Sequence, residues 1–142
     1  MPVLILVNSE ARMALVYLVI ALALLEFFAF GAAVGRARGR YGVAAPATSG
    51  HEMFERYYRV QMNTLELLVM WVPAMWIFAR ELSPAVAAGL GILYLIGRLV
   101  YFLAYVKDPK TRSLGFALSG GPTLLLVLGA VFGAARALWH HG

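Results

Sequence analysis

The sequence predicts an all-α integral membrane protein, a bundle of four transmembrane helices formed as a single domain by residues 1–142. The chain is 62% hydrophobic, with a mean hydropathy of +0.78, which is too apolar for a soluble domain of this size. Four apolar segments are each long enough to cross a hydrocarbon layer of ~30 Å as a helix. Basic residues cluster beside these segments, so membrane orientation explains the net charge of +5 better than a nucleic-acid partner does.

The first apolar segment covers residues 13–34, with Asn8 or Ser9 as its expected helix cap. Neither a basic region nor a clear cleavage site precedes it, which predicts a retained anchor and no removable signal peptide. Its Glu26 is a carboxylate well inside the span, where it should face the bundle interior. A structural hydrogen bond to another helix is favoured over a ligand role for this residue. Gly31 and Gly35 are spaced as a close-packing pair.

Residues 35–53 mix arginines with Gly, Pro, Thr and Ser and predict a surface loop. The second helix is expected over residues 54–79, and Pro73 inside it should produce a kink. Residues 80–83 form a tight turn. Because that connection is short, the second and third helices should be antiparallel neighbours.

The third helix begins after Pro84 and covers residues 85–106. A break at residues 107–110 separates it from the fourth helix, residues 114–135. Within the fourth helix, Ser119-Gly120-Gly121-Pro122 should loosen the helical structure, and Gly129 and Gly133 form a second packing pair.

Polar groups enter the second helix with a regular spacing. Arg59, Asn63 and Glu66 follow one another at i, i+4 and i+7, so they share one helix face over about 10 Å. A cation, an amide and a carboxylate in this order can hold a small zwitterion. Since polar groups inside a membrane are costly, this face is a candidate functional site.

The third helix carries a matching set, since Arg98, Tyr101 and Tyr105 lie at i, i+3 and i+7. Most basic residues flank the loops after the first and third helices, so the positive-inside rule places both loops in the cytoplasm and both termini outside. This orientation brings the two polar sets to the same depth, with Arg112 at the rim. The chain has no cysteine, so any thiol chemistry must come from a bound ligand. The adjacent His140 and His141 cannot face one metal from a helix, and no metal site is predicted.

Several motifs resemble one known family, the membrane-associated proteins in eicosanoid and glutathione metabolism (MAPEG). The resemblance covers residues 34–116, and the four-span layout extends it to the whole chain. The most specific part is Arg-x-Gln-x-Asn-x-x-Glu entering a membrane helix. The motifs that carry it are Val34-Gly35-Arg36-Ala37-Arg38, Phe54-Glu55-Arg56, Arg59-Val60-Gln61-Met62-Asn63 with Glu66, Gly97-Arg98-Leu99-Val100-Tyr101-Phe102 with Tyr105, and Arg112-Ser113-Leu114-Gly115-Phe116.

The resemblance is greatest to the branch that contains microsomal glutathione transferases and the leukotriene-forming synthase. It implies a homotrimer that binds glutathione between neighbouring subunits near the cytoplasmic face. Arg112 matches the arginine credited with holding the glutathione thiolate. Two positions differ from the family pattern. Leu67 stands where eukaryotic glutathione-binding members often have an aromatic residue, and Gly39 stands where the synthase has a second arginine. The positions that match glutathione-contacting or supporting residues are Arg38, Arg59, Gln61, Asn63, Glu66, Arg98, Tyr101 and Tyr105.

The resemblance and the polar residues together favour a glutathione-dependent transferase or peroxidase. The thiolate would attack a lipophilic electrophile or a lipid hydroperoxide that arrives from the bilayer. The alternative is a non-catalytic, lipid-binding membrane scaffold, and a small transporter is a weaker third interpretation because no inverted repeat is visible. An Ala/Gly/Arg-rich composition suggests a bacterial inner-membrane protein with periplasmic termini and a site that faces the cytoplasm.

Overall fold

The computed structural model describes the backbone of residues 2–141 and the side chains of residues 8–140. The described chain consists of four long helices and one short 3-10 turn, which fits a four-helix membrane bundle. The elements are α1 (Pro2–Arg40), α2 (Glu52–Glu81), α3 (Pro84–Lys107), η1 (Pro109–Thr111) and α4 (Ser113–His141).

The helix α1 is longer at both ends than the sequence predicted. Asn8 and Ser9 lie inside it and do not cap it, and the stretch 35–40, predicted as a loop, continues the helix. Gly42 ends it, with φ +67°, because a glycine adopts this left-handed conformation without a steric cost. The amide of Val43 then donates to the carbonyl of Arg38 at 3.1 Å. The arginines of this stretch are therefore presented by a helix.

The turn between α2 and α3 is shorter than predicted, because Arg80 and Glu81 belong to α2. Ser83 caps α3, since its side chain accepts a hydrogen bond from the amide of Val86. Both α2 and α4 continue through their internal prolines, Pro73 and Pro122. Neighbouring turns of a long membrane helix can accommodate a proline in this way.

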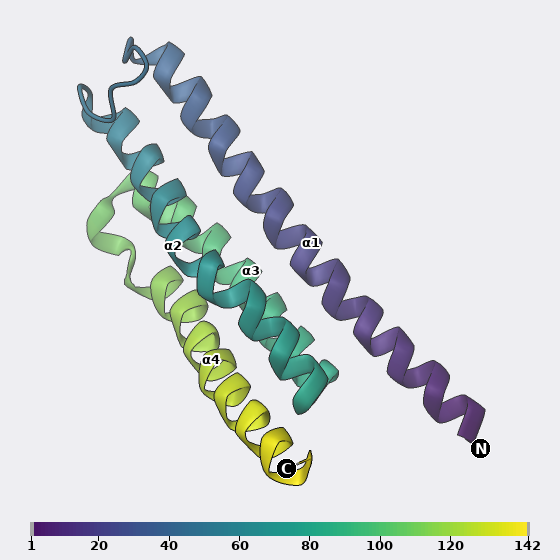
Figure 1. Cartoon of the computed structure of the whole chain (residues 1–142). Helices are drawn as coiled ribbons and strands as arrows, with labels where there is room; N and C mark the ends of the chain where they lie inside the picture. The colour runs from purple at the N-terminus through teal and green to yellow at the C-terminus, as the bar shows by residue number, and fades with distance from the viewer. Residues whose placement is uncertain (1, 142) are drawn as a thin grey trace.

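The helices alternate in direction, and both chain ends lie at one end of the bundle, opposite the loop that joins α1 to α2 (Figure 1). The helix α1 packs on α2 and α3, and α4 packs on the same two helices. The largest core cluster surrounds Trp71, Met75 and Tyr94, which are all fully buried. A smaller cluster of Phe30, Val60 and Tyr101 lies toward the loop end.

Close contacts between α3 and α4 depend on glycines. A Cβ added to Gly97 would lie 2.6 Å from the carbonyl carbon of Leu118, and one added to Gly115 would clash with the backbone of Tyr101. The predicted packing pair Gly129 and Gly133 also contacts the end of α2. These contacts fix α4 against the other helices along its length.

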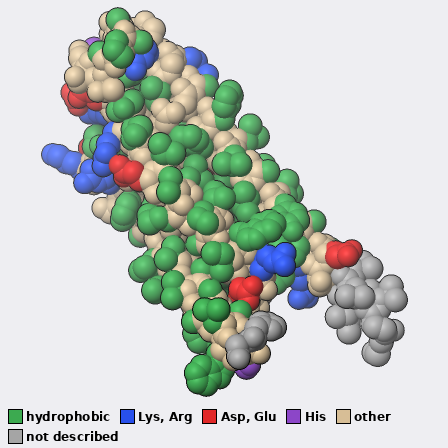
Figure 2. Space-filling model, viewed as in Figure 1, with side chains coloured by type: hydrophobic (Ala, Val, Ile, Leu, Met, Phe, Trp, Pro, Cys, Tyr) green, Lys and Arg blue, Asp and Glu red, His purple; other side chains and the backbone are tan. Residues whose placement is uncertain are grey.

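The face of the molecule drawn in Figure 2 is mainly apolar between two ends that carry charged side chains. Large hydrophobic side chains such as Leu25, Phe28, Leu128 and Phe132 are more than half exposed. All four long helices are long and apolar enough to cross a membrane. An exposed apolar surface of this extent is expected where lipid replaces water.

Candidate functional site

The polar face of α2 has the geometry that its spacing predicts. Arg59 Nη1 lies 3.6 Å from Glu66 Oε1, and Asn63 Nδ2 donates to Glu66 Oε2 at 3.3 Å. The side chains of Arg59 and Glu66 are 55% and 52% exposed. This face can therefore still accept a ligand, because each charged group keeps free hydrogen-bonding positions.

Arg98 of α3 lies behind this face and is fully buried. Its guanidinium donates to Asn63 Oδ1 at 3.2 Å, to Thr64 Oγ1 at 2.8 Å and to Ser119 Oγ at 3.2 Å. These contacts join α2, α3 and α4 at one point. Since a guanidinium is only a donor, it fixes the Asn63 amide with its oxygen inward and its NH2 group toward Glu66.

Tyr101, Tyr105 and Arg112 complete this side of the site. The two tyrosine rings lie 5.4 Å apart, and the guanidinium carbon of Arg98 lies 4.2 Å from the centroid of the Tyr101 ring. The corresponding distance from Arg112 to the Tyr105 ring is 5.9 Å. Such distances allow cation–π attraction.

A cavity of about 370 Å³ opens among these residues. Its volume is within the usual range for small-molecule sites. A neighbouring hollow of about 400 Å³ also includes Arg59 and Tyr105 in its lining. The lining of the first cavity consists of Arg59, Asn63, Tyr101, Arg112, Ser113 and Phe116.

The structure does not bring every predicted site residue to this cavity. Arg38 donates to the carbonyls of Val43, Ala44 and Ala47 and lies over the Phe54 ring. Gln61 points toward α1, where its Nε2 would lie 2.8 Å from a Cβ added to Gly31. Within one chain, Arg38 and Gln61 therefore stand apart from the other predicted residues.

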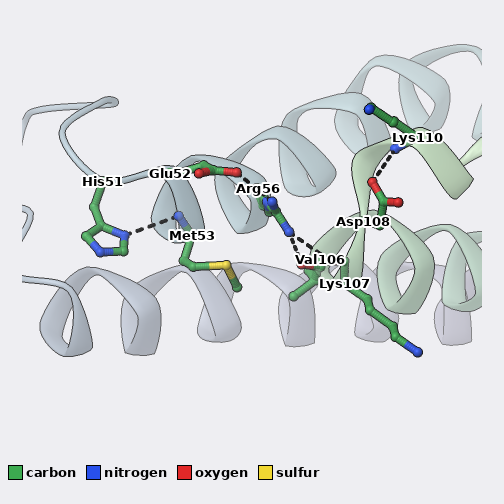
Figure 3. Close-up of polar contacts among 8 residues, drawn as sticks. All are labelled: His51, Glu52, Met53, Arg56, Val106, Lys107, Asp108 and Lys110. Atoms are coloured by element: carbon green, nitrogen blue, oxygen red, sulfur yellow. Dashed lines mark hydrogen bonds and ion pairs between the residues drawn. The ribbon is translucent and has the colours of Figure 1, made fainter.

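Three contributors were missed by sequence analysis. Thr64 and Ser119 hold Arg98, and short hydroxyl side chains in apolar helices gave no signal of this contact. Arg56 donates to the carbonyls of Val106 and Lys107 at 3.0 and 2.8 Å, as Figure 3 shows. The start of α2 is thereby attached to the end of α3. The position of Arg56, three residues before Arg59 on the same helix, could have indicated that Arg56 contributes.

The donors and acceptors of the site suit a zwitterionic ligand with more than one carboxylate. Arg59 and Arg112 offer guanidinium groups, which bind carboxylates through two parallel hydrogen bonds. Glu66 is a carboxylate near the cavity and suits an ammonium group, and Asn63 can bond an amide. Arg98 is too deeply buried to touch such a ligand and acts through Asn63.

Comparison with known proteins identifies the family of the chain. The MAPEG family model matches residues 14–137. An uncharacterized protein of Synechocystis is 45% identical over 114 residues, which cover 80% of this chain and 83% of the relative. Human microsomal glutathione S-transferase 2 is 36% identical over 75% of this chain and 73% of its own length. Leukotriene C4 synthase of Cavia porcellus is 32% identical over 78% of this chain and 63% of its own length. The chain has four helices long and apolar enough to cross a membrane, and the family model matches most of its length. It is therefore an integral membrane protein that belongs to the MAPEG family.

Proposed function

We propose that the protein is a membrane-bound glutathione transferase, which adds the thiolate of glutathione to lipophilic electrophiles. The observation that carries the proposal is the cavity lined by Arg59, Asn63 and Arg112, beside the ion pair of Arg59 with Glu66. The similarity to microsomal glutathione S-transferase 2 and leukotriene C4 synthase supports glutathione as the thiol substrate.

Glutathione carries two carboxylates, one ammonium group, two peptide groups and a thiol. In the proposed complex Arg59 binds a carboxylate, Glu66 binds the ammonium group and Asn63 bonds a peptide group. Tyr101 and Tyr105 form the wall against α3. Arg112 lies at the rim and holds the sulfur as a thiolate.

Ionisation of the thiol is the main chemical task of the site. A thiol with a reference pKa near 8.5 is only about 3% ionised at pH 7. Lowering this pKa by about two units leaves roughly three quarters of the thiol ionised. This requires ~2.7 kcal/mol of stabilisation of the thiolate relative to the thiol. The Arg112 guanidinium supplies most of this stabilisation, because opposite charge favours the ionised form, and Arg59 in the same cavity adds to it.

The thiol proton passes to solvent, and the sulfur forms a bond to an electrophilic carbon while the leaving group departs. With a lipid hydroperoxide, the sulfur attacks the terminal oxygen and the O–O bond breaks. An alcohol and a glutathione sulfenic acid result, and a second glutathione converts the sulfenic acid into a disulfide and water. No nucleophile from the protein takes part.

We further propose that the complete site forms between subunits of a homotrimer. Arg59 and Glu66 are about half exposed on a helix long and apolar enough to span the membrane, and charged groups facing lipid are costly. A neighbouring subunit would cover them and supply Arg38 and Gln61 from its own α1–α2 side. The arginine-rich end of the bundle supports a cytoplasmic location for the site by the positive-inside rule, in a bacterial inner membrane.

A conjugation assay tests the proposal. The purified protein is mixed with glutathione and a small aromatic halide, and formation of the thioether is followed with time. We expect a rate that saturates with glutathione and requires the folded protein.

The competing function is a lipid-binding scaffold without catalysis. It is favoured by an apolar hollow of about 510 Å³ between α1 and α2, which includes Tyr17, Leu24, Pro73 and Trp76. Copurified lipid together with no conjugation above the uncatalysed rate would support the scaffold and contradict the transferase.

A further inference from the structure

The register between α1 and α3 places Glu26 opposite Arg98. A Cβ added to Gly91 would lie 2.6 Å from Val19 Cγ1, and the rings of Phe30 and Phe102 stack at 4.7 Å. Val19 and Gly91 are as far apart in sequence as Phe30 and Phe102 are. Equal separations are expected because α1 and α3 are parallel and keep one register. Glu26 and Arg98 have this same separation and lie between the two contacts.

The interior around Arg98 contains buried polar atoms that are not yet satisfied. Glu26 Oε1, the Tyr94 hydroxyl and Arg98 Nε are each buried without a hydrogen-bond partner among the described residues. Tyr94 and Arg98 are fully buried, and Trp71 stacks on Tyr94 at 4.4 Å. Buried polar atoms are normally paired directly or through an ordered water. Three such atoms on two parallel helices therefore indicate one shared polar site.

The charge of Arg98 also needs a partner. Its side-chain hydrogen bonds go to Asn63, Thr64 and Ser119, which are all neutral. Glu66 pairs with Arg59 and accepts from Asn63, and no contact joins it to Arg98 among the described residues. Among the described residues, Glu26 is the carboxylate that the shared register places opposite Arg98, with its Oε1 buried inside the bundle. An uncompensated buried charge is strongly unfavourable.

We propose that Glu26 is the counter-charge of Arg98 and a positioning residue for the site. Glu26 holds the Arg98 guanidinium in place through a hydrogen bond that is either direct or bridged by an ordered water. Arg98 in turn orients the Asn63 amide toward Glu66. A carboxylate on α1 thus supports the ligand-binding face of α2 through α3. The inference rests on the proposed function, because its effect is expressed in glutathione binding.

The test compares Glu26→Gln, Glu26→Asp and the control Glu10→Gln in the full-length protein. Glu10 is on the same helix and exposed. Loss of a residue that orients a binding group commonly costs about tenfold or more. We expect Glu26→Gln to raise the KM for glutathione about tenfold while kcat at saturating glutathione changes less than about threefold. Glu26→Asp should restore much of the affinity, and Glu10→Gln should have no effect. Unchanged KM in Glu26→Gln would overturn the proposal.

Thermal unfolding gives a second measurement that does not depend on glutathione. Glu26→Gln and Arg98→Gln should each lower Tm, and the double variant should lose less than the sum of the two single losses, because both members of the charge pair are then absent. Additive losses in the double variant would contradict the pairing. If the wild-type protein binds no glutathione, the proposed function fails, and this thermal cycle alone decides whether Glu26 and Arg98 are paired.

Discussion

Replacing Arg112 with alanine separates the chemistry of the proposed site from ligand binding. Arg112 lines the cavity and lies 5.9 Å from the Tyr105 ring. If its main role is to stabilise the thiolate, its loss should lower turnover much more than affinity. Lys110→Ala is the matched control, since Lys110 is a nearby exposed cation outside the cavity lining.

The size of the effect follows from electrostatics. A cation about 4 Å from the sulfur contributes ~4 kcal/mol at an effective dielectric constant of about 20. Arg112 is solvent-exposed, and screening reduces this to ~2 kcal/mol, or about 1.5 units in the thiol pKa. Ionisation alone then lowers the rate at pH 7 roughly tenfold. Loss of transition-state stabilisation extends the expected decrease in kcat to about 10- to 1000-fold.

The assay is the pH dependence of kcat with an aromatic halide as the second substrate. In Arg112→Ala the rising limb should move to higher pH, because the thiol then ionises at higher pH. Lys110→Ala should retain the wild-type profile. Full turnover and an unshifted profile in Arg112→Ala would contradict a thiolate-stabilising role for Arg112, and Arg38 would become the next residue to test.

Three further predictions concern binding, stability and assembly. Glu66→Gln should weaken glutathione binding about 10- to 100-fold, as expected for a lost charged hydrogen bond, and unchanged affinity by calorimetry would remove Glu66 from the site. Arg56→Ala loses the bonds to the carbonyls of Val106 and Lys107 and should be less stable by ~1.5–3 kcal/mol; an unchanged thermal midpoint would contradict this role. The purified protein should have the mass of a trimer by light scattering in detergent, and a monomer with full glutathione affinity would count against the intersubunit site.

Helical periodicity made much of the site predictable from sequence. Residues spaced by three or four positions share a face whatever surrounds the helix, and this placed Arg59 with Glu66 and Tyr101 with Tyr105. The short connection after α2 predicted antiparallel neighbours. These inferences depend only on local geometry, so they survive without knowledge of the packing.

Contacts between helices were not predictable in the same way. Arg38 binds carbonyls of the following loop, and the path of that loop is not encoded in a regular spacing. Ser119 holds Arg98 because Gly97 and Gly115 let α3 and α4 approach closely, and Thr64 reaches the same guanidinium from α2. Ser and Thr are common in membrane helices, so neither residue stood out. The end of α1 was misplaced because its glycines and arginines resemble a loop, whereas Gly42 alone ends the helix.

The most direct test of the account is an ultraviolet titration of the wild-type protein with glutathione at neutral pH. We expect a thiolate absorption band that grows with glutathione, saturates with the calorimetric binding curve and is lost in Arg112→Ala until the pH is raised. Binding without a thiolate band, or neither a band nor binding heat, would contradict the claim that this site binds and ionises glutathione.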